Sequence, residues 1–311
     1  MKNGSFKLRH LLSVFSFSFV FLLFLSSVAC STPRREVSKN LIITSMVPVA
    51  TLIENITHGA GWHVEYLVKP GIDNPHAFSL KPSDAFKVEK AALVFAVGCG
   101  MDPYLEKSVP ENEKRRFVDL GKHVFLKEPT LMIPGNPHWW LDPYLLLIAA
   151  RKVRDTFVSM DGANSELYAR NYAYFKSAVE DLLKKKQEFY SLKSKKVASL
   201  TATFAYMFRR YGIKEVTLIP HTGYAPSGND VTVFLNSITM EGMNFLLIPN
   251  VYAGRIHETI REEYKRRLGR DLKIVTLDAV GYDFRRGRTV FILDAIEKDL
   301  DIIKSLLSGG N

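Results

Sequence analysis

Short runs of apolar, β-branched residues recur along most of the chain and alternate with helical segments. Seven of these runs have the length and composition of buried strands. They lie at residues 41–46, 64–70, 92–98, 196–200, 215–219, 244–250 and 273–277. A shorter run falls near 117–120. Strands that alternate with helices are typical of parallel sheets with helices on both faces, so the pattern predicts an α/β fold.

One segment interrupts this alternation with a long helical pattern. Between Ser165 and Leu192 apolar residues recur at helical steps, and no Pro or Gly intervenes. The stripe consists of Tyr168, Tyr172, Phe175, Val179, Leu182 and Phe189, with Lys186 in a skipped position. A continuous helix of about 28 residues would be roughly 42 Å long, enough to connect two lobes. A coiled coil is not favoured, because the stripe covers only about three heptads.

The chain therefore predicts two α/β lobes, each a mostly parallel sheet flanked by helices, joined by one long rigid helix. We expect the N-terminal lobe at residues 38–162, the linking helix at 163–194 and the C-terminal lobe at 195–311. In open α/β sheets, ligands bind beyond the carboxyl ends of the strands. Two lobes that face each other would form a cleft at these ends.

The first residues of the chain have a different composition. Basic residues precede an apolar run at 11–29 that ends in small residues, which is the layout of a secretory signal peptide over residues 1–29. An uncleaved membrane anchor is the alternative, although five serines within the run disfavour it. The stretch Ser27-Val28-Ala29-Cys30 resembles the lipobox of bacterial lipoproteins, except at Ser27, where an aliphatic residue is usual. This resemblance implies a lipid on Cys30, a lipidated tether at 30–37 and a location in the periplasm or at the cell surface.

Charge and motifs exclude several other classes of protein. The formal net charge is +10, and removal of the three basic residues of the signal peptide leaves about +7. The remaining Lys and Arg residues are scattered rather than clustered with aromatic residues, so no nucleic-acid partner is expected. Neither a serine triad nor a phosphate loop ending in GKS or GKT is present, so nucleophilic hydrolysis and nucleotide binding have no support.

Candidate metal ligands follow several of the predicted strands. His76 follows the strand at 64–70, His138 follows the loop after 117–120, and Asp278 comes directly after 273–277. Two imidazoles and a carboxylate from both halves of the chain can form a site for a divalent transition metal. The other histidines, His58, His63, His123 and His257, are interpreted as surface or core residues.

Some neighbours of these candidates have structural explanations. Asp142 before Pro143 is typical of a helix N-cap, and Lys81-Pro82-Ser83-Asp84 also predicts the start of a helix. The tryptophans at 139 and 140 are interpreted as buried packing residues. His138 is the residue of this segment that lacks a structural explanation.

Taken together, the motifs resemble the solute-binding proteins of bacterial metal ABC importers, which deliver zinc, manganese or iron. The resemblance spans the mature chain and rests on PHAFSLKPSD at 75–84, PHWWLDP at 137–143, FAYMFRRYG at 204–212 and LDAVG at 277–281. It implies that His76, His138 and Asp278 bind the metal as cargo. It also implies an ABC permease and its ATPase as partners, an exported monomer, and no enzymatic activity.

One position departs from the family pattern. Where members carry a third ligand, His or Glu, this chain has Thr201, which is a poor metal ligand by comparison. Three interpretations stay open. In the first, water completes the coordination; in the second, His221 just beyond the strand at 215–219 replaces the missing ligand; in the third, high-affinity metal binding has been lost.

These residues suggest capture and release of a metal between the two lobes, with small lobe movements. The affinity is expected to fall as the pH drops through the histidine range, because the ligands must be unprotonated. Asp73 or Asp142 could orient the imidazoles. The alternatives are a surface lipoprotein that has weakened or lost metal binding and acts in adhesion, and a metal-dependent hydrolase. No HExxH motif supports a hydrolase.

Overall fold

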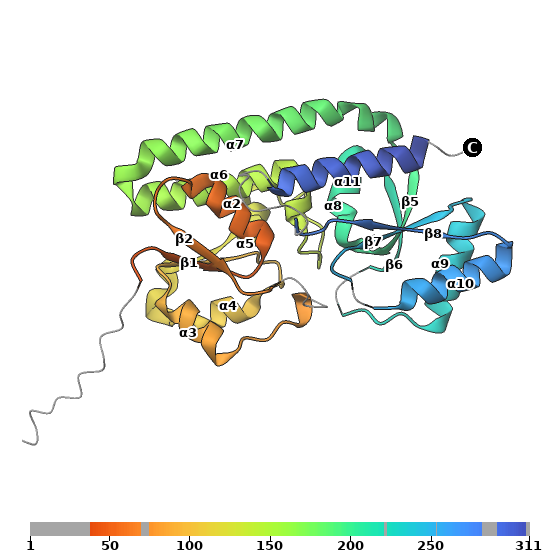
Figure 1. The fold of residues 1–311 in the computed structure, drawn as a ribbon, viewed down its shortest axis with the longest axis horizontal. Coiled ribbons are helices and arrows are strands. Elements are labelled where there is room, and N and C mark those ends of the chain that lie inside the picture. The colour runs from red at the N-terminus through yellow and green to blue at the C-terminus, as the bar shows by residue number, and fades with distance from the viewer. Residues whose placement is uncertain (1–37, 70–74, 221–222, 253, 282–290, 309–311) are drawn as a thin grey trace, which may run out of the picture. The chain divides into compact units, whose positions relative to one another are not determined.

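The computed structural model describes residues 38–69, 75–220, 223–252, 254–281 and 291–308, which contain two four-stranded parallel sheets (Figure 1). The first sheet has the order β2-β1-β3-β4 and the second the order β6-β5-β7-β8. The strands of the first are β1 (Leu41–Thr44), β2 (His63–Tyr66), β3 (Leu93–Ala96) and β4 (Phe117–Asp119). Those of the second are β5 (Lys196–Thr201), β6 (Lys214–Ile219), β7 (Phe245–Pro249) and β8 (Lys273–Leu277). All eight predicted strands, and the α/β fold class, are confirmed.

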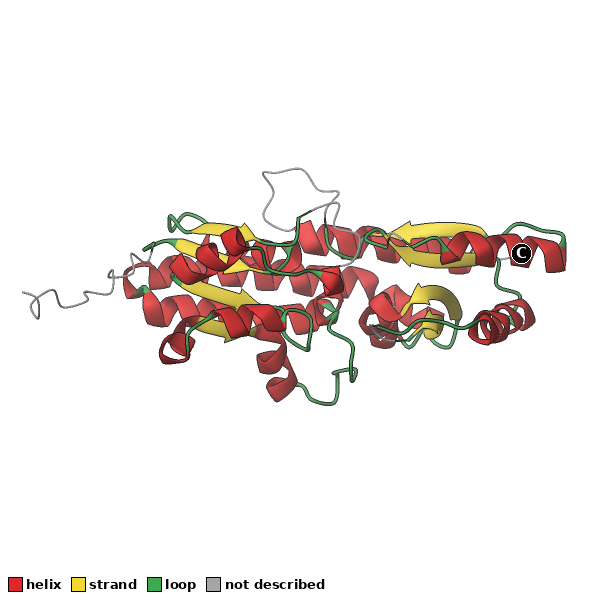
Figure 2. Ribbon diagram, turned by 90° about the horizontal axis from the view of Figure 1, so that it is seen from below, coloured by secondary structure: helices red, strands yellow, loops and turns green. Residues whose placement is uncertain are grey.

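Helices cover both faces of each sheet (Figure 2). Successive residues of a strand point to opposite faces, so Phe95 joins one core cluster while Val94 and Ala96 join another. The α-helices before the linking helix are α2 (Val47–Thr57), α3 (Pro82–Lys90), α4 (Pro103–Ser108), α5 (Leu120–Lys127) and α6 (Pro143–Met160). Those after it are α8 (Ala205–Tyr211), α9 (Gly228–Met240), α10 (Ile256–Leu268) and α11 (Phe291–Ser308).

Short 3₁₀ turns connect these elements. They are η1 (Pro75–Ala77), η2 (Glu111–Arg116), η3 (Trp139–Leu141), η4 (Gly162–Asn164), η5 (Lys186–Leu192) and η6 (Ala202–Phe204). Two of them, η1 and η3, lie in the segments that carry His76 and His138. The predicted helix start at Pro143 is confirmed, since Asp142 is the N-cap of α6 and its side chain accepts hydrogen bonds from the backbone N–H of Tyr144 and Leu145.

The linking helix α7 (Ser165–Lys185) runs beside both sheets in Figure 1. The predicted apolar stripe is buried, and the helix continues without a break to Leu192, as predicted, with its last seven residues in the tighter 3₁₀ form of η5. A tightening of the final turn into a 3₁₀ helix is common at helix ends. Lys186, in the skipped position of the stripe, is buried as well, and its ammonium pairs with Asp301 of α11.

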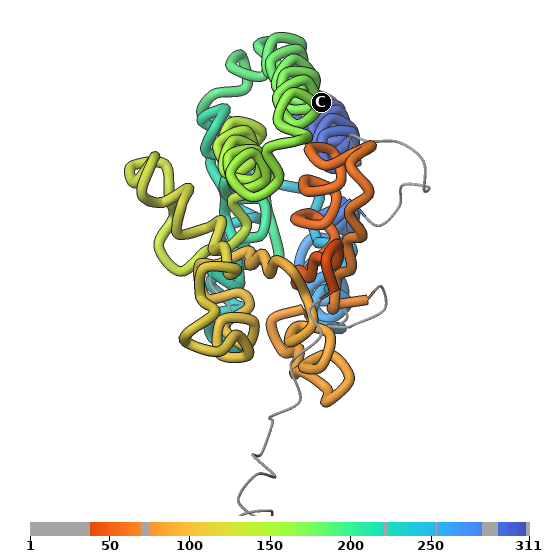
Figure 3. Tube along the Cα trace, turned by 90° about the vertical axis from the view of Figure 1, so that its left-hand side faces the viewer, coloured from red at the N-terminus to blue at the C-terminus, as the bar shows by residue number. Residues whose placement is uncertain are grey.

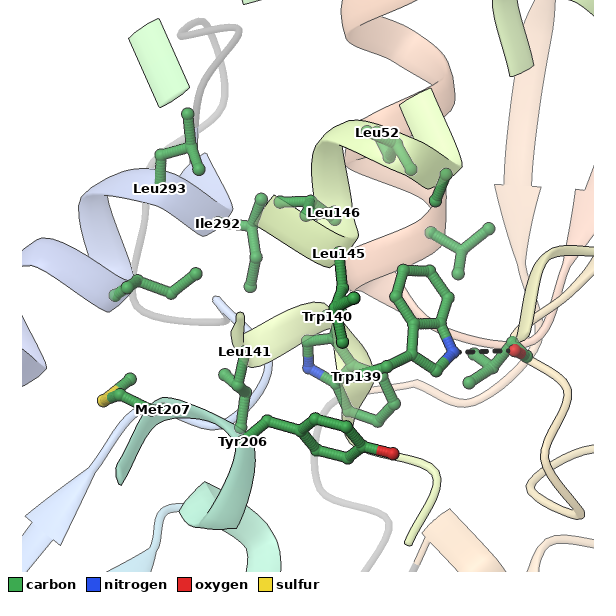
Figure 4. Close-up of a cluster of buried hydrophobic side chains, with 14 of the residues drawn as sticks. Leu52, Trp139, Trp140, Leu141, Leu145, Leu146, Tyr206, Met207, Ile292 and Leu293 are labelled. Atoms are coloured by element: carbon green, nitrogen blue, oxygen red, sulfur yellow. Dashed lines mark hydrogen bonds between the residues drawn. The ribbon is translucent and has the colours of Figure 1, made fainter. Parts of the chain in front are cut away.

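Four helices pack together as one layer: α2, α6, α7 and α11 (Figure 3). The C-terminal helix α11 contacts α2 and α7, so the end of the chain packs against helices from its first half. At the base of this layer a cluster of buried side chains includes Trp139, Trp140 and Tyr206 together with Ile292 of α11 (Figure 4). The exact lobe boundaries stay a prediction.

Within the described ranges no helix is both long and apolar enough to cross a membrane. The predicted signal peptide, Cys30 and the tether at 30–37 lie outside the described residues, as do Asp73 and His221.

Candidate metal site

A cavity of about 460 Å³ opens where the carboxyl ends of the two sheets meet. Both lobes line it: His76, Asn136 and His138 come from the first, and Thr201 and Tyr252 from the second. Most of the remaining wall is apolar, formed by Met46, Pro75, Met101, Pro137, Trp140, Ile219, Pro220, Pro249, Val251 and Val280 among others. None of the described lining residues is Asp, Glu, Lys or Arg, so the polar groups of this part of the wall are neutral imidazoles, hydroxyls and amides.

The structure brings His76 and His138, two of the candidate ligands, close together. Their ring centroids are 5.4 Å apart and the rings meet edge to face at 76°. His76 lies in η1 and His138 directly precedes η3, so two short turns present the two rings to one cavity. Two imidazoles at this separation can face a common ion.

Burial keeps both imidazoles neutral. It lowers the pKa of His76 from its usual value, and burial together with the nearby His76 lowers the pKa of His138 to about 3. Neutral imidazole is the form that binds a metal. Protons therefore begin to compete with a metal only below the ordinary histidine range. The pH range over which the metal affinity is expected to fall thus moves to lower pH.

Asn136 sets the orientation of His138. Its Oδ1 accepts hydrogen bonds from the backbone N–H of His138 at 2.9 Å and from Nδ1 of the ring at 2.8 Å, while its Nδ2 donates to the carbonyl of Ala202 at 2.6 Å. A neutral imidazole carries one N–H, so a proton on Nδ1 leaves Nε2 with a bare lone pair. The side chain on Nδ1 is thus Asn136 and not Asp142, which caps α6 and pairs with Arg210 at 2.6 Å.

Asp278 is buried in the second lobe, directly after β8. Its Oδ1 accepts three hydrogen bonds, from Nδ2 of Asn250 at 2.7 Å and from the backbone N–H groups of Val280 and Gly281 at 3.1 and 2.8 Å. Its Oδ2 is buried and has no hydrogen-bond partner among the residues that the structure describes. A buried carboxylate oxygen without a partner is unfavourable in the free protein and is available to a cation.

The three predicted ligands are not assembled in this structure. No group of three His, Cys, Asp or Glu side chains among the described residues is close enough to hold one ion. Ala279 and Val280 line the cavity, so the segment that carries Asp278 borders the cavity without placing its carboxylate beside the imidazoles. Thr201 does line the cavity, at the end of β5, where its hydroxyl lies 2.8 Å from that of Thr203.

Several hydrogen bonds connect the two lobes around the cavity. The Tyr206 hydroxyl accepts from the N–H of Ile133 at 2.9 Å and donates to the carbonyl of Asn136 at 3.0 Å. The indole N–H of Trp140 donates to the carbonyl of Ala279 at 2.8 Å. Within the first lobe, the indole N–H of Trp139 donates to the carbonyl of Val97 at 3.0 Å (Figure 4). Both tryptophans are buried, as predicted. These bonds fix the loop of His138 relative to the loop that follows Asp278.

Sequence reasoning missed Asn136, Asn250 and Tyr206. Asn136 stands in a Gly-Asn-Pro stretch that predicts a turn, and its position two residues before His138 was the available signal. Asn250 follows β7 and so occupies the same kind of strand end that singled out Asp278. Nothing in the local pattern around Tyr206 indicates a bond to a residue about 70 positions away.

The fold and the cavity define a two-lobed α/β binding protein with its ligand site between the carboxyl ends of two parallel sheets. Residues 42–304 match the family model described as zinc-uptake complex component A, periplasmic (ZnuA). The chain belongs to this family.

Curated relatives and solved structures agree with this assignment. A Thermotoga maritima protein named for metal binding is 27% identical over 277 residues, which cover 86% of this chain and 92% of the relative. The iron-binding protein YfeA of Yersinia pestis is 26% identical over 209 residues, covering 65% and 67%. The periplasmic zinc-binding protein TroA of Treponema pallidum has a similar fold, with a TM-score of 0.77 at 18% identity, covering 87% of this chain and 99% of that one.

Proposed function

We propose that this protein is the extracytoplasmic substrate-binding component of an ABC importer. It captures a divalent transition metal, Zn, Mn or Fe, in the cavity and delivers it to a membrane permease driven by an ATPase. The observation that carries this proposal is the pair of neutral imidazoles, His76 and His138, at the wall of a cavity between two lobes. The family assignment and relatives named for iron, zinc and manganese support it.

The proposed ligand set is Nε2 of His138, the ring of His76 and Oδ2 of Asp278. Because the carboxylate does not stand beside the imidazoles in the structure, an ion bound by all three ligands would require the Asp278 loop to approach the first lobe. Thr201 contributes at most a neutral hydroxyl, so water or His221 supplies the remaining position. The protein is exported by the signal peptide at 1–29, is anchored through Cys30 and acts as a monomer.

Several features favour transport over catalysis. A metal-dependent hydrolase needs a general base beside the metal-bound water, and no described residue of the cavity wall is Asp or Glu. A carrier needs ligands that hold the ion reversibly, and two neutral imidazoles with one carboxylate can do so. The wall and the family agree on binding and release.

Elemental analysis of the purified mature protein tests the proposal, with H76A, H138A and D278A as variants. We expect about one metal per chain in the wild type and a strong loss in each variant. H63A is the matched control, since His63 is exposed on β2 and pairs only with Glu65 among the interactions described. Equal metal contents in the wild type and all three site variants would refute the proposal.

Two more variants distinguish the remaining ligand. If His221 completes the coordination, H221A lowers the affinity while T201A does not. If water completes it, neither variant changes the affinity substantially, and a loss in T201A alone assigns the position to the hydroxyl. Isothermal titration with Zn²⁺ and Mn²⁺ at pH 7.5 measures all three cases.

A further inference from the structure

Two asparagines, one in each lobe, contact the candidate ligands in the same manner. We propose that Asn136 and Asn250 are positioning residues of the metal site. Each engages one polar atom of its ligand and leaves the other atom, Nε2 of His138 or Oδ2 of Asp278, for the ion. This inference rests on the proposed function and deepens it, because it assigns which atoms meet the metal and what holds them there.

The geometry around Asn136 determines the assignment of its own amide. Its Nδ2 lies 2.6 Å from the carbonyl oxygen of Ala202, and a carbonyl can only accept, so the amide oxygen faces His138. That oxygen receives both the backbone N–H and the ring Nδ1–H of His138. The ring is held at two points, with its second nitrogen directed away from the asparagine.

Asn250 follows β7 and performs the corresponding task for Asp278. Its Nδ2 donates to Oδ1 of Asp278, its Oδ1 accepts from the N–H of Ala279 at 3.1 Å, and its own N–H donates to the carbonyl of Leu277 at 2.9 Å. Asn250 thus bonds to the residues on both sides of Asp278 as well as to its carboxylate. Every described hydrogen bond to the carboxylate reaches Oδ1, and Oδ2 is buried without a partner in the described part of the chain.

Both positioning groups are neutral amides, which has a chemical consequence. A carboxylate on the second nitrogen of a ligating histidine would raise the basicity of the ring and strengthen the metal bond. An amide fixes the tautomer and the orientation without adding negative charge. Asn136 also holds Ala202, next to Thr201, so the orientation of His138 is coupled to the end of β5 in the other lobe.

The first test measures the tautomer of His138 in the metal-free protein by long-range ¹H–¹⁵N NMR. We expect the Nδ1–H form in the wild type and a mixture with the Nε2–H form in N136A. N136D keeps an acceptor for Nδ1–H but loses the donor to Ala202, so it should retain the wild-type tautomer. N171A is the matched control, because Asn171 also donates to backbone carbonyls, of Ile56 and His58, but lies outside the cavity lining.

An unchanged tautomer in N136A would overturn the role of Asn136. This readout needs no metal, so it decides the question even if the wild type binds none and the proposed function fails. A merely structural role would lower the melting temperature without changing the tautomer ratio.

The second test uses metal affinity for Asn250. We expect N250A to lower the Zn²⁺ affinity about 10–100-fold, the usual effect of removing a group that orients a metal ligand, with N171A unchanged. The D278A variant keeps two imidazoles and should still bind Zn²⁺ weakly but measurably. In this background N250A should not lower the Zn²⁺ affinity any further. An equal loss with and without Asp278 would show that Asn250 does not act through that carboxylate and would overturn its assignment.

Discussion

The ion pair between Arg210 and Asp142 joins the two lobes behind the cavity, and its removal should be costly. Arg210 of α8 places its Nε 2.6 Å from Oδ1 of Asp142, which also caps α6. Asp142 is buried, and burial raises the pKa of its carboxyl group even with the guanidinium beside it. In the R210M variant the carboxylate would keep its two bonds to the helix N-terminus but lose its counter-ion.

Breaking a buried ion pair by removing one partner costs about 3–5 kcal/mol. We expect R210M to lose about 3 kcal/mol of unfolding free energy at pH 8, the lower end, because the helix N-terminus still stabilises the charge. The folded-state pKa of Asp142 lies above its unfolded value, and loss of Arg210 raises it further. As the pH falls through the raised pKa, folded R210M therefore binds a proton on Asp142 that the unfolded chain does not yet bind. The loss of unfolding free energy relative to the wild type should be largest at pH 8 and should shrink over this pH range.

Urea denaturation of the metal-free protein at pH 8 and pH 5 measures both values. The conservative control is R266M, since Arg266 forms an exposed pair with Glu263 on α10, where the expected loss is below about 1 kcal/mol. A deficit below 1 kcal/mol, or one of the same size at both pH values, would contradict this account of the ion pair.

Three further outcomes follow from the site and the sheets. Because the pKa values of His76 and His138 are lowered, metal affinity should stay nearly constant from pH 7.5 to 6.5. At lower pH the affinity should fall by up to about tenfold per pH unit for each imidazole that becomes protonated. An affinity that already falls above pH 6.5 argues against this. W140F removes the buried bond to the Ala279 carbonyl and should cost about 1–3 kcal/mol in urea denaturation. Burial raises the pKa of Glu215 from 4.5 to about 7, a difference that corresponds to about 3 kcal/mol at roughly 1.4 kcal/mol per unit. E215Q should therefore gain up to about 3 kcal/mol at pH 8.5, where the folded wild type holds the ionised form. Most of this gain should be lost at pH 5, where the folded carboxyl group is protonated, and an equal gain at both pH values would exclude this cause.

The sheets could be predicted because their signal is local. A run such as LIIT or LVFA is long enough to define a buried strand, and each is followed by a helix that forces a parallel crossover. The cap at Asp142 is local in the same sense. The linking helix to Leu192 was predictable from its apolar spacing, but the change from α-helix to 3₁₀ helix at Lys186 was not, because it depends on how the last turns pack.

The site was predictable only in part, since its determinants are mostly contacts over long sequence distances. The pair of His76 and His138 followed from the positions of both residues after strands. The distance of Asp278 from that pair depends on how two separately folded lobes are set against each other, which no local pattern encodes. Metal sites often use a carboxylate to orient a histidine ligand, and a carboxylate was therefore predicted beside His138. The chain instead uses the amide of Asn136, which also bonds to the other lobe.

Thr201 adds no charge to a cavity whose described wall is otherwise neutral, and this affects which ions the proposed site can hold. With two neutral imidazoles and one carboxylate, a divalent cation would keep a net positive charge in a mostly apolar cavity, so water must stay bound or the ion must be held loosely. Hard cations depend on several oxygen ligands, and Mg²⁺ gives up its water reluctantly, so such a site disfavours Mg²⁺ and Ca²⁺ far more than ions that accept imidazole nitrogen. In the proposed site, Thr201 would therefore weaken the hold on every dication while leaving the discrimination against Mg²⁺ and Ca²⁺ intact.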